Sequence, residues 1–257
     1  MDGGGRLILI FGIDCAAQEK NVGLAAGRFD GKKVRFTDLR SESPRRSVCA
    51  RILDGLSGAS RALLAMDAPL GWPQSMGDEL ASHVAGRPIR TPPNDLFRRL
   101  TDHATRSSIS KVPMDVGADR IARAAHAALR LIGEVEAGLG RRIPLAWAPP
   151  VGPGVWAIEV YPGGFLKANG VAAFGYKEPD AQGMRRAMLE RLRVFYPLEE
   201  PEGQDCTVDQ HLFDAALCVL SATDFLTGRS APPGKAQRAR AVKEGWIWTR
   251  GPRLPML

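Results

Sequence analysis

The feature that most constrains this chain is an uncharged run of branched and aromatic residues that ends in a carboxylate, Leu7-Ile8-Leu9-Ile10-Phe11-Gly12-Ile13-Asp14. Such a run predicts a strand that is buried on both faces, as found inside an α/β sheet. A buried carboxylate without a partner is costly, so it meets a proton, a cation or a metal ion. We therefore interpret Asp14 as a metal ligand. The alternative is an Asp that only turns or caps the end of the strand.

The composition is that of a globular protein with an excess of positive charge. Of 257 residues, 44% are hydrophobic and 25% are charged, which predicts a single domain over residues 1–257. The formal net charge of +7 favours an anionic partner, of which nucleic acid is the obvious one. The cysteines form no C-x-x-C motif, and Cys15 and Cys218 fall in apolar runs as core thiols do. No apolar run approaches about 18 residues, so we expect no membrane contact and a cytoplasmic location.

Two β-rich runs follow Asp14. Residues 21–29 and 33–39 are joined by Asp30-Gly31, a dipeptide typical of hairpin turns. We therefore expect the chain to begin with three consecutive antiparallel strands.

A second apolar strand ending in an acid comes next. The stretch 43–58 predicts a helix with Ser43 as its N-cap, and residues 61–67 then form an apolar run that ends in Asp67 and a Pro/Gly turn. A strand, a helix and another strand favour a parallel, right-handed crossover. Ligands of open α/β sheets gather at the carboxyl ends of such strands. This order predicts that Asp14 and Asp67 meet.

The middle of the chain has a different pattern. Residues 72–150 are rich in Ala and Arg and predict helices at 76–85, 94–104 and 117–138, followed by a Pro/Gly-rich connector at 143–154. We interpret 72–150 as a helical insertion that covers the site.

A third apolar strand, at residues 155–162, also carries an acid. Alternation places Glu159 on the same face as Ala157 and Tyr161. Glu159 is then either part of the site or a solvated side chain on an edge strand.

A capping-box spacing marks the start of the last long helix. Thr207 is the expected N-cap and Gln210 follows three residues later, while Asp209 is expected to interact with the helix dipole. Residues 211–228 are apolar almost all round, so this helix is expected to be buried.

Two polar residues interrupt that apolar helix. His211 and Asp214 are three residues apart and share a face. Asp214 is expected in the site, and His211 is a metal ligand, a proton carrier or a solvated side chain. A basic helix is also predicted at 180–195, and a final strand-like segment at 245–248.

Acids thus occur at the ends of four elements that are predicted to be buried: Asp14, Asp67, Glu159 and Asp214. Oxygen ligands without a thiolate cluster suit Mg²⁺ or Mn²⁺. Two such ions can activate a water and stabilise the leaving oxygen in phosphodiester hydrolysis. Basic residues of the insertion are expected to contact backbone phosphates: Arg99, Lys111, Arg120 or Arg123.

Several motifs resemble the successive signatures of the domain of unknown function 429 family. They are Phe11-Gly12-Ile13-Asp14, Met66-Asp67-Ala68-Pro69-Leu70-Gly71, Arg99-Leu100-Thr101-Asp102, Gly117-Ala118-Asp119-Arg120, Ile158-Glu159-Val160-Tyr161-Pro162 and His211-Leu212-Phe213-Asp214-Ala215. The resemblance extends from about residue 7 to about residue 250. The last motif is also similar to the final catalytic helix of Holliday-junction resolvases.

The resemblance implies a ribonuclease-H-like fold: an α/β protein whose mixed sheet has three antiparallel strands and then parallel strands, flanked by helices. It also implies a nuclease. In that interpretation Asp14, Asp67 and Asp214 hold the metal, and His211 lies beside them.

The leading hypothesis is a two-metal, Mg²⁺- or Mn²⁺-dependent nuclease. Its expected catalytic residues are Asp14, Asp67, Glu159, His211 and Asp214. Its expected substrate-binding residues are Arg99, Asp102, Lys111 and Arg120.

Two alternatives remain open. An actin-like ATPase or sugar kinase also begins with a strand that ends in Asp, but Asp14 is followed by Cys-Ala-Ala-Gln, which lacks the glycine and hydroxyl groups of a phosphate-binding turn. A binding protein without catalysis is the other. It would bind nucleic acid in a salt-dependent way and would need no metal.

Overall fold

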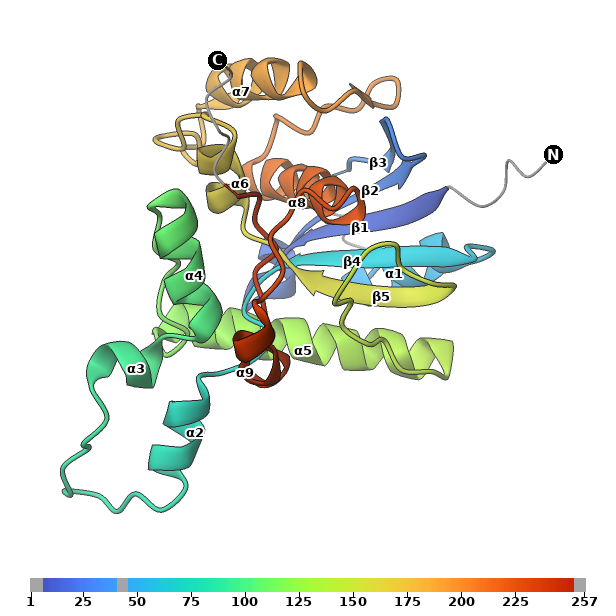
Figure 1. Cartoon of the computed structure of the whole chain (residues 1–257). Helices are drawn as coiled ribbons and strands as arrows, with labels where there is room; N and C mark the ends of the chain where they lie inside the picture. Colours follow the sequence, from blue (N-terminus) through green and yellow to red (C-terminus); the bar gives the residue numbers. More distant parts are fainter. Residues whose placement is uncertain (1–6, 41–45, 252–257) are drawn as a thin grey trace.

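A mixed β-sheet lies at the centre of the part of the chain that this computed structural model describes, residues 7–40 and 46–251 (Figure 1). Its six strands run in the order β5-β4-β1-β2-β3-β6. The strands are β1 (Ile8–Asp14), β2 (Gly23–Phe29), β3 (Val34–Asp38), β4 (Arg61–Asp67), β5 (Gly154–Glu159) and β6 (Leu198–Glu199). β1, β2 and β3 pair antiparallel, and β1, β4 and β5 pair parallel, as does β6 with β3.

The described helices surround this sheet (Figure 1). They are α1 (Val48–Leu56), α2 (Gln74–Leu80), α3 (Pro93–Phe97), α4 (Leu100–Ile109), α5 (Asp119–Leu139), α6 (Pro162–Ala168), α7 (Gln182–Arg193), α8 (Gln210–Leu226) and α9 (Arg238–Glu244), with 3₁₀ turns at Glu19–Asn21 and Lys235–Gln237.

The predicted hairpin and the predicted parallel crossover are both confirmed. Asp30 accepts backbone hydrogen bonds in the turn between β2 and β3. Helix α1 connects β3 to β4, which pairs parallel with β1. The N-cap of α1 is Ser47. The predicted cap, Ser43, lies outside the described residues.

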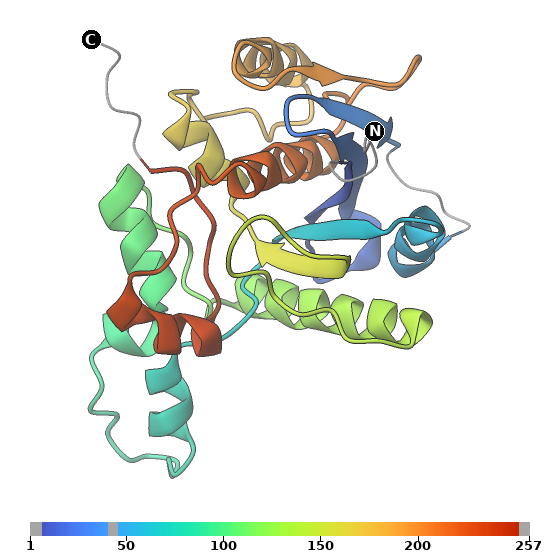
Figure 2. The same cartoon turned by 45° about the vertical axis from the view of Figure 1, so that its right-hand side comes forward.

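Helices cover both faces of the sheet (Figure 2). In β1, Ile8 and Ile10 belong to the core under α8, whereas Leu9 and Phe11 belong to the core formed with α1 and α5. This alternation follows from the two-residue period of a strand. The opening strand is thus buried on both faces, as its sequence predicts.

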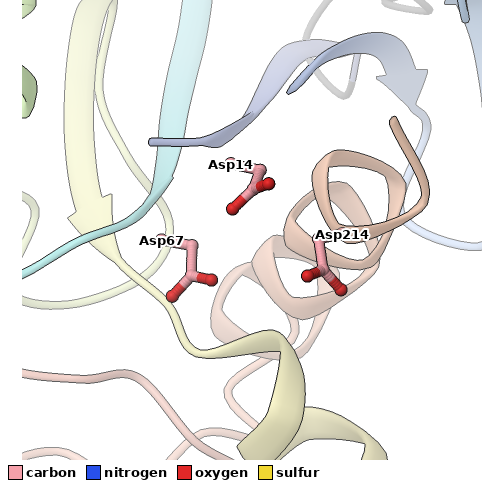
Figure 3. A group of neighbouring side chains, drawn as sticks. All are labelled: Asp14, Asp67 and Asp214. Carbon is pink, nitrogen blue, oxygen red and sulfur yellow. The ribbon is translucent and has the colours of Figure 1, made fainter. Parts of the chain in front are cut away.

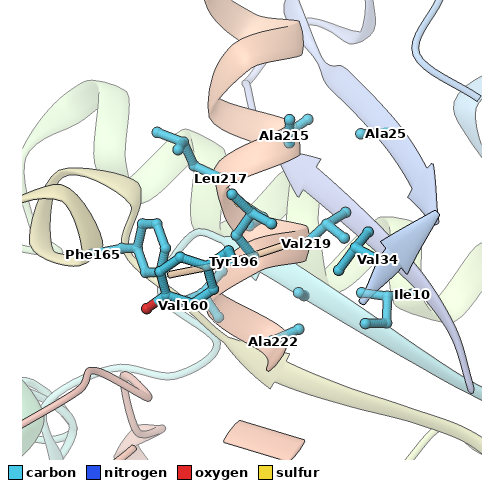
Figure 4. Packing of buried hydrophobic residues seen from close by; sticks show 14 of the residues in the cluster. Ile10, Ala25, Val34, Val160, Phe165, Tyr196, Ala215, Leu217, Val219 and Ala222 are labelled. Atoms are coloured by element: carbon cyan, nitrogen blue, oxygen red, sulfur yellow. The ribbon is translucent and has the colours of Figure 1, made fainter. Parts of the chain in front are cut away.

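Two glycines let α8 lie close to the sheet. A Cβ atom at Gly12 would lie 2.0 Å from the carbonyl oxygen of Ala215, and one at Gly23 would lie 1.9 Å from that of His211. No residue with a side chain fits at such a distance. Figure 4 shows the apolar side chains that pack around this contact. The first half of α8 is therefore held against the ends of β1 and β2.

The segment 72–150 divides into two parts. Helices α2 and α3 project from the body of the molecule (Figure 1), while α5 packs on the sheet through residues such as Ala128 and Ile132. The helix predicted at 94–104 is two helices, α3 and α4, because the chain is extended at Arg98 and Arg99. The backbone N–H of Arg99 donates to Asp102, which fixes the start of α4.

Two predictions for the carboxyl-terminal part of the chain are wrong. The N-cap of α8 is Asp209 rather than Thr207, because the Asp209 carboxylate accepts the backbone N–H groups of His211 and Leu212. The predicted strand at 245–248 forms only a single bridge beside Glu159, since the chain leaves the sheet edge after one pairing.

This topology is the ribonuclease-H-like arrangement: an antiparallel β1-β2-β3 unit, parallel strands beside β1, and a long helix across the sheet. Among the described residues, no helix combines the length and the apolar character needed to cross a membrane.

Candidate metal centre

Asp14 and Asp67 are neighbours because of strand register. β1 and β4 pair in parallel with Asp14 directly opposite Asp67. Paired residues of adjacent strands point to the same face. In β1 and β4 this is the face under α8, because Ile10 and Leu63, an even number of residues before each acid, belong to that core. The sequence prediction that the two acids meet is confirmed.

Helix α8 adds the third acid. The close contact at Gly12 and Gly23 brings Asp214, on the second turn of α8, to the ends of the strands. Figure 3 shows the carboxylates of Asp14, Asp67 and Asp214 turned toward a common space. One oxygen from each residue lies within 4.8 Å of the others. Within residues 7–40 and 46–251, these aspartates are the group of three or more possible metal ligands that lie close enough together to share an ion.

His211 orients Asp14. Its Nδ1 atom lies 2.6 Å from Oδ2 of Asp14, and Gln210 contacts the other ring nitrogen at 3.2 Å. The hydrogen bond to Asp14 raises the pKa of His211. His211 is therefore beside the acids, as predicted, and its ring holds one oxygen of Asp14 in place.

Lys177 and Tyr176 are site residues that the sequence analysis missed. Lys177 Nζ lies 2.6 Å from Oδ2 of Asp214, and the Tyr176 hydroxyl donates to Oδ1 at 2.8 Å. Partial burial opposes the charge of Lys177, but the Asp214 carboxylate raises its pKa. The only sequence signal for this pair is a Tyr-Lys after Gly175, in a loop without helical or strand periodicity.

Arg185 fixes the loop that carries these two residues. Its side chain is 1% exposed and donates to the carbonyl oxygens of Tyr176 and Thr207 at 2.8 and 2.7 Å. One guanidinium group thus joins the Lys177 loop to the segment before α8. Such a multidentate contact positions both segments around Asp214.

The three acids differ in how their charge is satisfied. Burial raises the pKa of Asp14 to about 6, against the opposing hydrogen bond from His211. Burial and the charges of Asp14 and Asp214 raise the pKa of Asp67 well above its ordinary value. Among the described residues, no side chain forms a hydrogen bond or a direct ion pair with Asp67, and the charge of Lys177 only partly opposes the rise in its pKa. Asp67 therefore needs a proton or a cation.

Glu159, the fourth predicted acid, has a different partner. β5 is an edge strand, yet Glu159 is only 3% exposed, so the solvated alternative is wrong. Arg99 donates to both of its oxygens, at 2.8 and 2.7 Å. Burial raises the pKa of Glu159, and the charge of Arg99 opposes this shift. The Leu70 backbone N–H also donates to Glu159 at 3.0 Å, which fixes the turn after Asp67.

Arg99 and Asp102 form a buried ion pair, 3.0 Å apart. Their exposed fractions are 2% and 1%, so the guanidinium is held by Asp102 and Glu159 rather than presented to solvent. Their predicted role in substrate binding would require this pair to open. The geometry instead makes them part of the support for the turn after Asp67.

A pocket of about 500 Å³ opens beside Asp14 and Asp67. Lys111 is among the residues that line it, while Arg120 is exposed on α5 and does not line it. Cys218 is fully buried, as predicted, but Cys15 is only partly buried and also lines the pocket. Of the predicted phosphate contacts, Arg99 and Lys111 line this pocket, but Arg99 is already bound to Asp102 and Glu159.

The donor set fits a hard divalent cation. Three carboxylates in close proximity repel one another unless protons or cations intervene, and Mg²⁺ and Mn²⁺ prefer oxygen ligands. Asp67 and the free oxygen of Asp14 are available, whereas both oxygens of Asp214 already have partners. The arrangement can hold an ion at Asp14 and Asp67. Asp214 can become a third ligand only if Lys177 releases its carboxylate oxygen.

The fold and the site together define a class: a ribonuclease-H-like α/β protein with three converging aspartates at the strand ends. Residues 12–238 match the family described as "Protein of unknown function (DUF429)", and the chain belongs to that family. Comparison with curated proteins and with solved structures gave no match. The family that the motifs resemble is therefore confirmed.

Proposed function

We propose that the protein is a Mg²⁺- or Mn²⁺-dependent phosphodiesterase that acts on nucleic acid. The observation that carries this proposal is the convergence of Asp14, Asp67 and Asp214, with one oxygen each within 4.8 Å, beside a pocket of about 500 Å³. The net charge of +7 supports an anionic substrate.

Each residue has a distinct task in this proposal. Asp14, Asp67 and Asp214 would hold the divalent ion or ions, and His211 would keep the Asp14 carboxylate oriented. Bound divalent cations activate a water and stabilise the leaving oxygen in phosphodiester hydrolysis. Lys177 balances part of the negative charge when no ion is bound. Glu159 accepts a hydrogen bond from the Leu70 backbone N–H and so fixes the turn that follows Asp67.

The test compares one site acid with an exposed acid. We expect the purified chain to cleave DNA or RNA oligonucleotides with Mg²⁺ or Mn²⁺ and to be inactive in chelator. Asp67→Asn should lower the rate at least about a hundredfold, because removing a metal ligand removes several kcal/mol of transition-state stabilisation.

Asp78→Asn is the matched control, since Asp78 is exposed on α2 and does not line the pocket. Its activity should equal that of the unchanged chain. Undiminished, metal-dependent cleavage by a folded Asp67→Asn variant would refute the proposed site. Salt-dependent binding of nucleic acid without any turnover would indicate a binding protein instead.

A further inference from the structure

The pocket beside the acids is lined by both carboxylates and apolar side chains. Asp14 and Asp67 form one part of its lining, and apolar or aromatic side chains form much of the rest. Its volume of about 500 Å³ lies within the range of sites that hold small organic groups. A site that contacted only a phosphate backbone would need cations rather than an apolar wall.

Two apolar side chains at this pocket are unusually exposed. Phe174 is 90% exposed and Met114 is 63% exposed, and both line the pocket. Phe174 belongs to the connection between α6 and α7, and Met114 to the connection between α4 and α5. A large apolar side chain in water is stabilised when a ligand covers it. Two separate segments therefore present apolar surface to the same space.

Lys111 supplies a cation to this pocket. It lines the pocket, and its Nζ lies 6.0 Å from the centre of the Tyr161 ring. No acid in the described part of the chain forms an ion pair with Lys111. Lys177, by contrast, is bound to Asp214. Lys111 is thus available to a phosphate group.

We infer that this pocket binds one unpaired nucleotide of a nucleic-acid strand. Its base lies against Phe174 and Met114, and its phosphate is directed to Lys111 and the carboxylate side. Aromatic side chains bind bases by stacking on their faces, which are accessible only when the base is unpaired or flipped out. The inference rests on the proposed function and names its substrate: a single strand, or an unpaired end, rather than a continuous duplex.

The experiment measures binding to a single-stranded oligonucleotide that carries the fluorescent base 2-aminopurine, and to the blunt duplex of the same sequence. Binding is measured in Ca²⁺, which oxygen ligands also hold. We expect the single strand to bind at least about tenfold more tightly, with quenching of the base as it stacks. Phe174→Ala should weaken this binding about tenfold and remove the quenching.

Val194→Ala is the control, because Val194 is 75% exposed and does not line the pocket. It should bind like the unchanged chain. Phe174 is almost fully exposed, so its replacement leaves the fold intact, and circular dichroism checks this. Equal binding of the duplex, or full binding and quenching by Phe174→Ala, would overturn the inference. Equal affinity for a nucleoside 5′-monophosphate would also overturn it, because a free nucleotide would then be the occupant.

Hydrolysis in Mn²⁺ is measured on the same preparations, so that the two proposals fail separately. Stacking of the single strand on Phe174 without hydrolysis would refute the phosphodiesterase and uphold the nucleotide pocket. Metal-dependent cleavage that is equally fast on duplex and unaffected by Phe174→Ala would uphold the phosphodiesterase and refute the pocket.

Discussion

At the scale of single residues, Lys177 places a positive charge inside the group of aspartates. Its ammonium group lies 2.6 Å from one oxygen of Asp214, and Tyr176 occupies the other oxygen. A divalent ion that uses Asp214 as a ligand must compete with this ammonium group. Among the described residues, no ammonium or hydroxyl group is bound directly to Asp67, although the charge of Lys177 acts on it from further away. The number of ions that the site holds therefore depends on Lys177.

We expect Lys177→Met to tighten Mn²⁺ binding by about tenfold, because a like charge beside the ion is removed. Lys177→Arg keeps the charge and should bind Mn²⁺ like the unchanged chain. Lys167→Met, at an exposed lysine on α6, is the control. Isothermal titration calorimetry gives both the affinity and the number of ions. An unchanged or weaker affinity in Lys177→Met would show that the ammonium does not oppose the ion.

At the scale of secondary-structure elements, the contact between α8 and β1 sets the distance between the acids. Asp14 ends the strand and Asp214 lies on the helix, so any separation of the two elements also separates the carboxylates. Gly12 permits this contact, because a Cβ there would lie 2.0 Å from Ala215 O and 2.8 Å from a methyl group of Val219. Gly12 thus determines how closely the carboxylates of Asp14 and Asp214 can approach each other.

We expect Gly12→Ala to lower the free energy of unfolding by about 3 kcal/mol, because the overpacked helix must move away from the strand. The movement should also weaken Mn²⁺ binding. Gly133→Ala is the matched control: Gly133 lies on α5 with nothing near its missing Cβ. This change should stabilise the chain by about 0.5–1 kcal/mol through helix propensity. Chemical denaturation measures both, and a Gly12→Ala variant as stable as the unchanged chain would contradict the packing argument.

The sequence predicts this element-level arrangement well where local and long-range signals agree. The runs that end in Asp14 and Asp67, the Asp30-Gly31 turn and the apolar helix with Asp214 predict the neighbours of β1, the β2-β3 hairpin and the three acids. Periodicity and turn chemistry are local, so they are readable from one chain. The sequence does not reveal which residue caps α8, because Thr207 and Asp209 both have capping side chains and only the backbone conformation decides which one is used.

Other features depend on contacts between distant segments. Lys177 reaches Asp214 across 37 positions of sequence, and Arg99 reaches Glu159 across 60. Neither pairing has a periodic pattern. The alternation of the strand correctly places Glu159 on the face opposite Ile158. It contains no information about Arg99, which binds the Glu159 carboxylate. The acids of the candidate site are therefore predictable from the sequence, whereas the residues that support them are not.

At the scale of the whole molecule, the site costs stability when no cation fills it. The pKa of Asp14 rises from 3.8 to about 6 on folding, so the folded state holds its proton more tightly than the unfolded state. That contribution is present below about pH 4 and is lost as the pH rises from there to about 6. His211 has a raised pKa, and its contribution is likewise lost as the pH rises through the folded value.

We therefore expect the metal-free chain to lose thermal stability as the pH rises from about 4 to about 6, and to lose more as the pH passes the raised pKa of His211. Mn²⁺ should raise Tm, and the increase should grow over the same interval because ligation requires deprotonated carboxylates. Thermal unfolding in chelator and in Mn²⁺ measures both effects. In Asp14→Asn the pH-dependent loss should shrink. A Tm increase from Mn²⁺ that is independent of pH, or equal in that variant, would exclude Asp14 as a ligand.

The carboxylate of Glu244, at the end of α9, has a consequence for the order in which the chain becomes structured. It accepts the backbone N–H groups of Gln74 and Leu100, at the beginnings of α2 and α4, both at 2.7 Å. These are unsatisfied donors that a helix start leaves open. The two hydrogen bonds join positions that lie 170 and 144 residues apart in the sequence. On the ribosome these bonds can form only after Glu244 has been synthesised, so they cannot direct the earlier formation of α2 and α4.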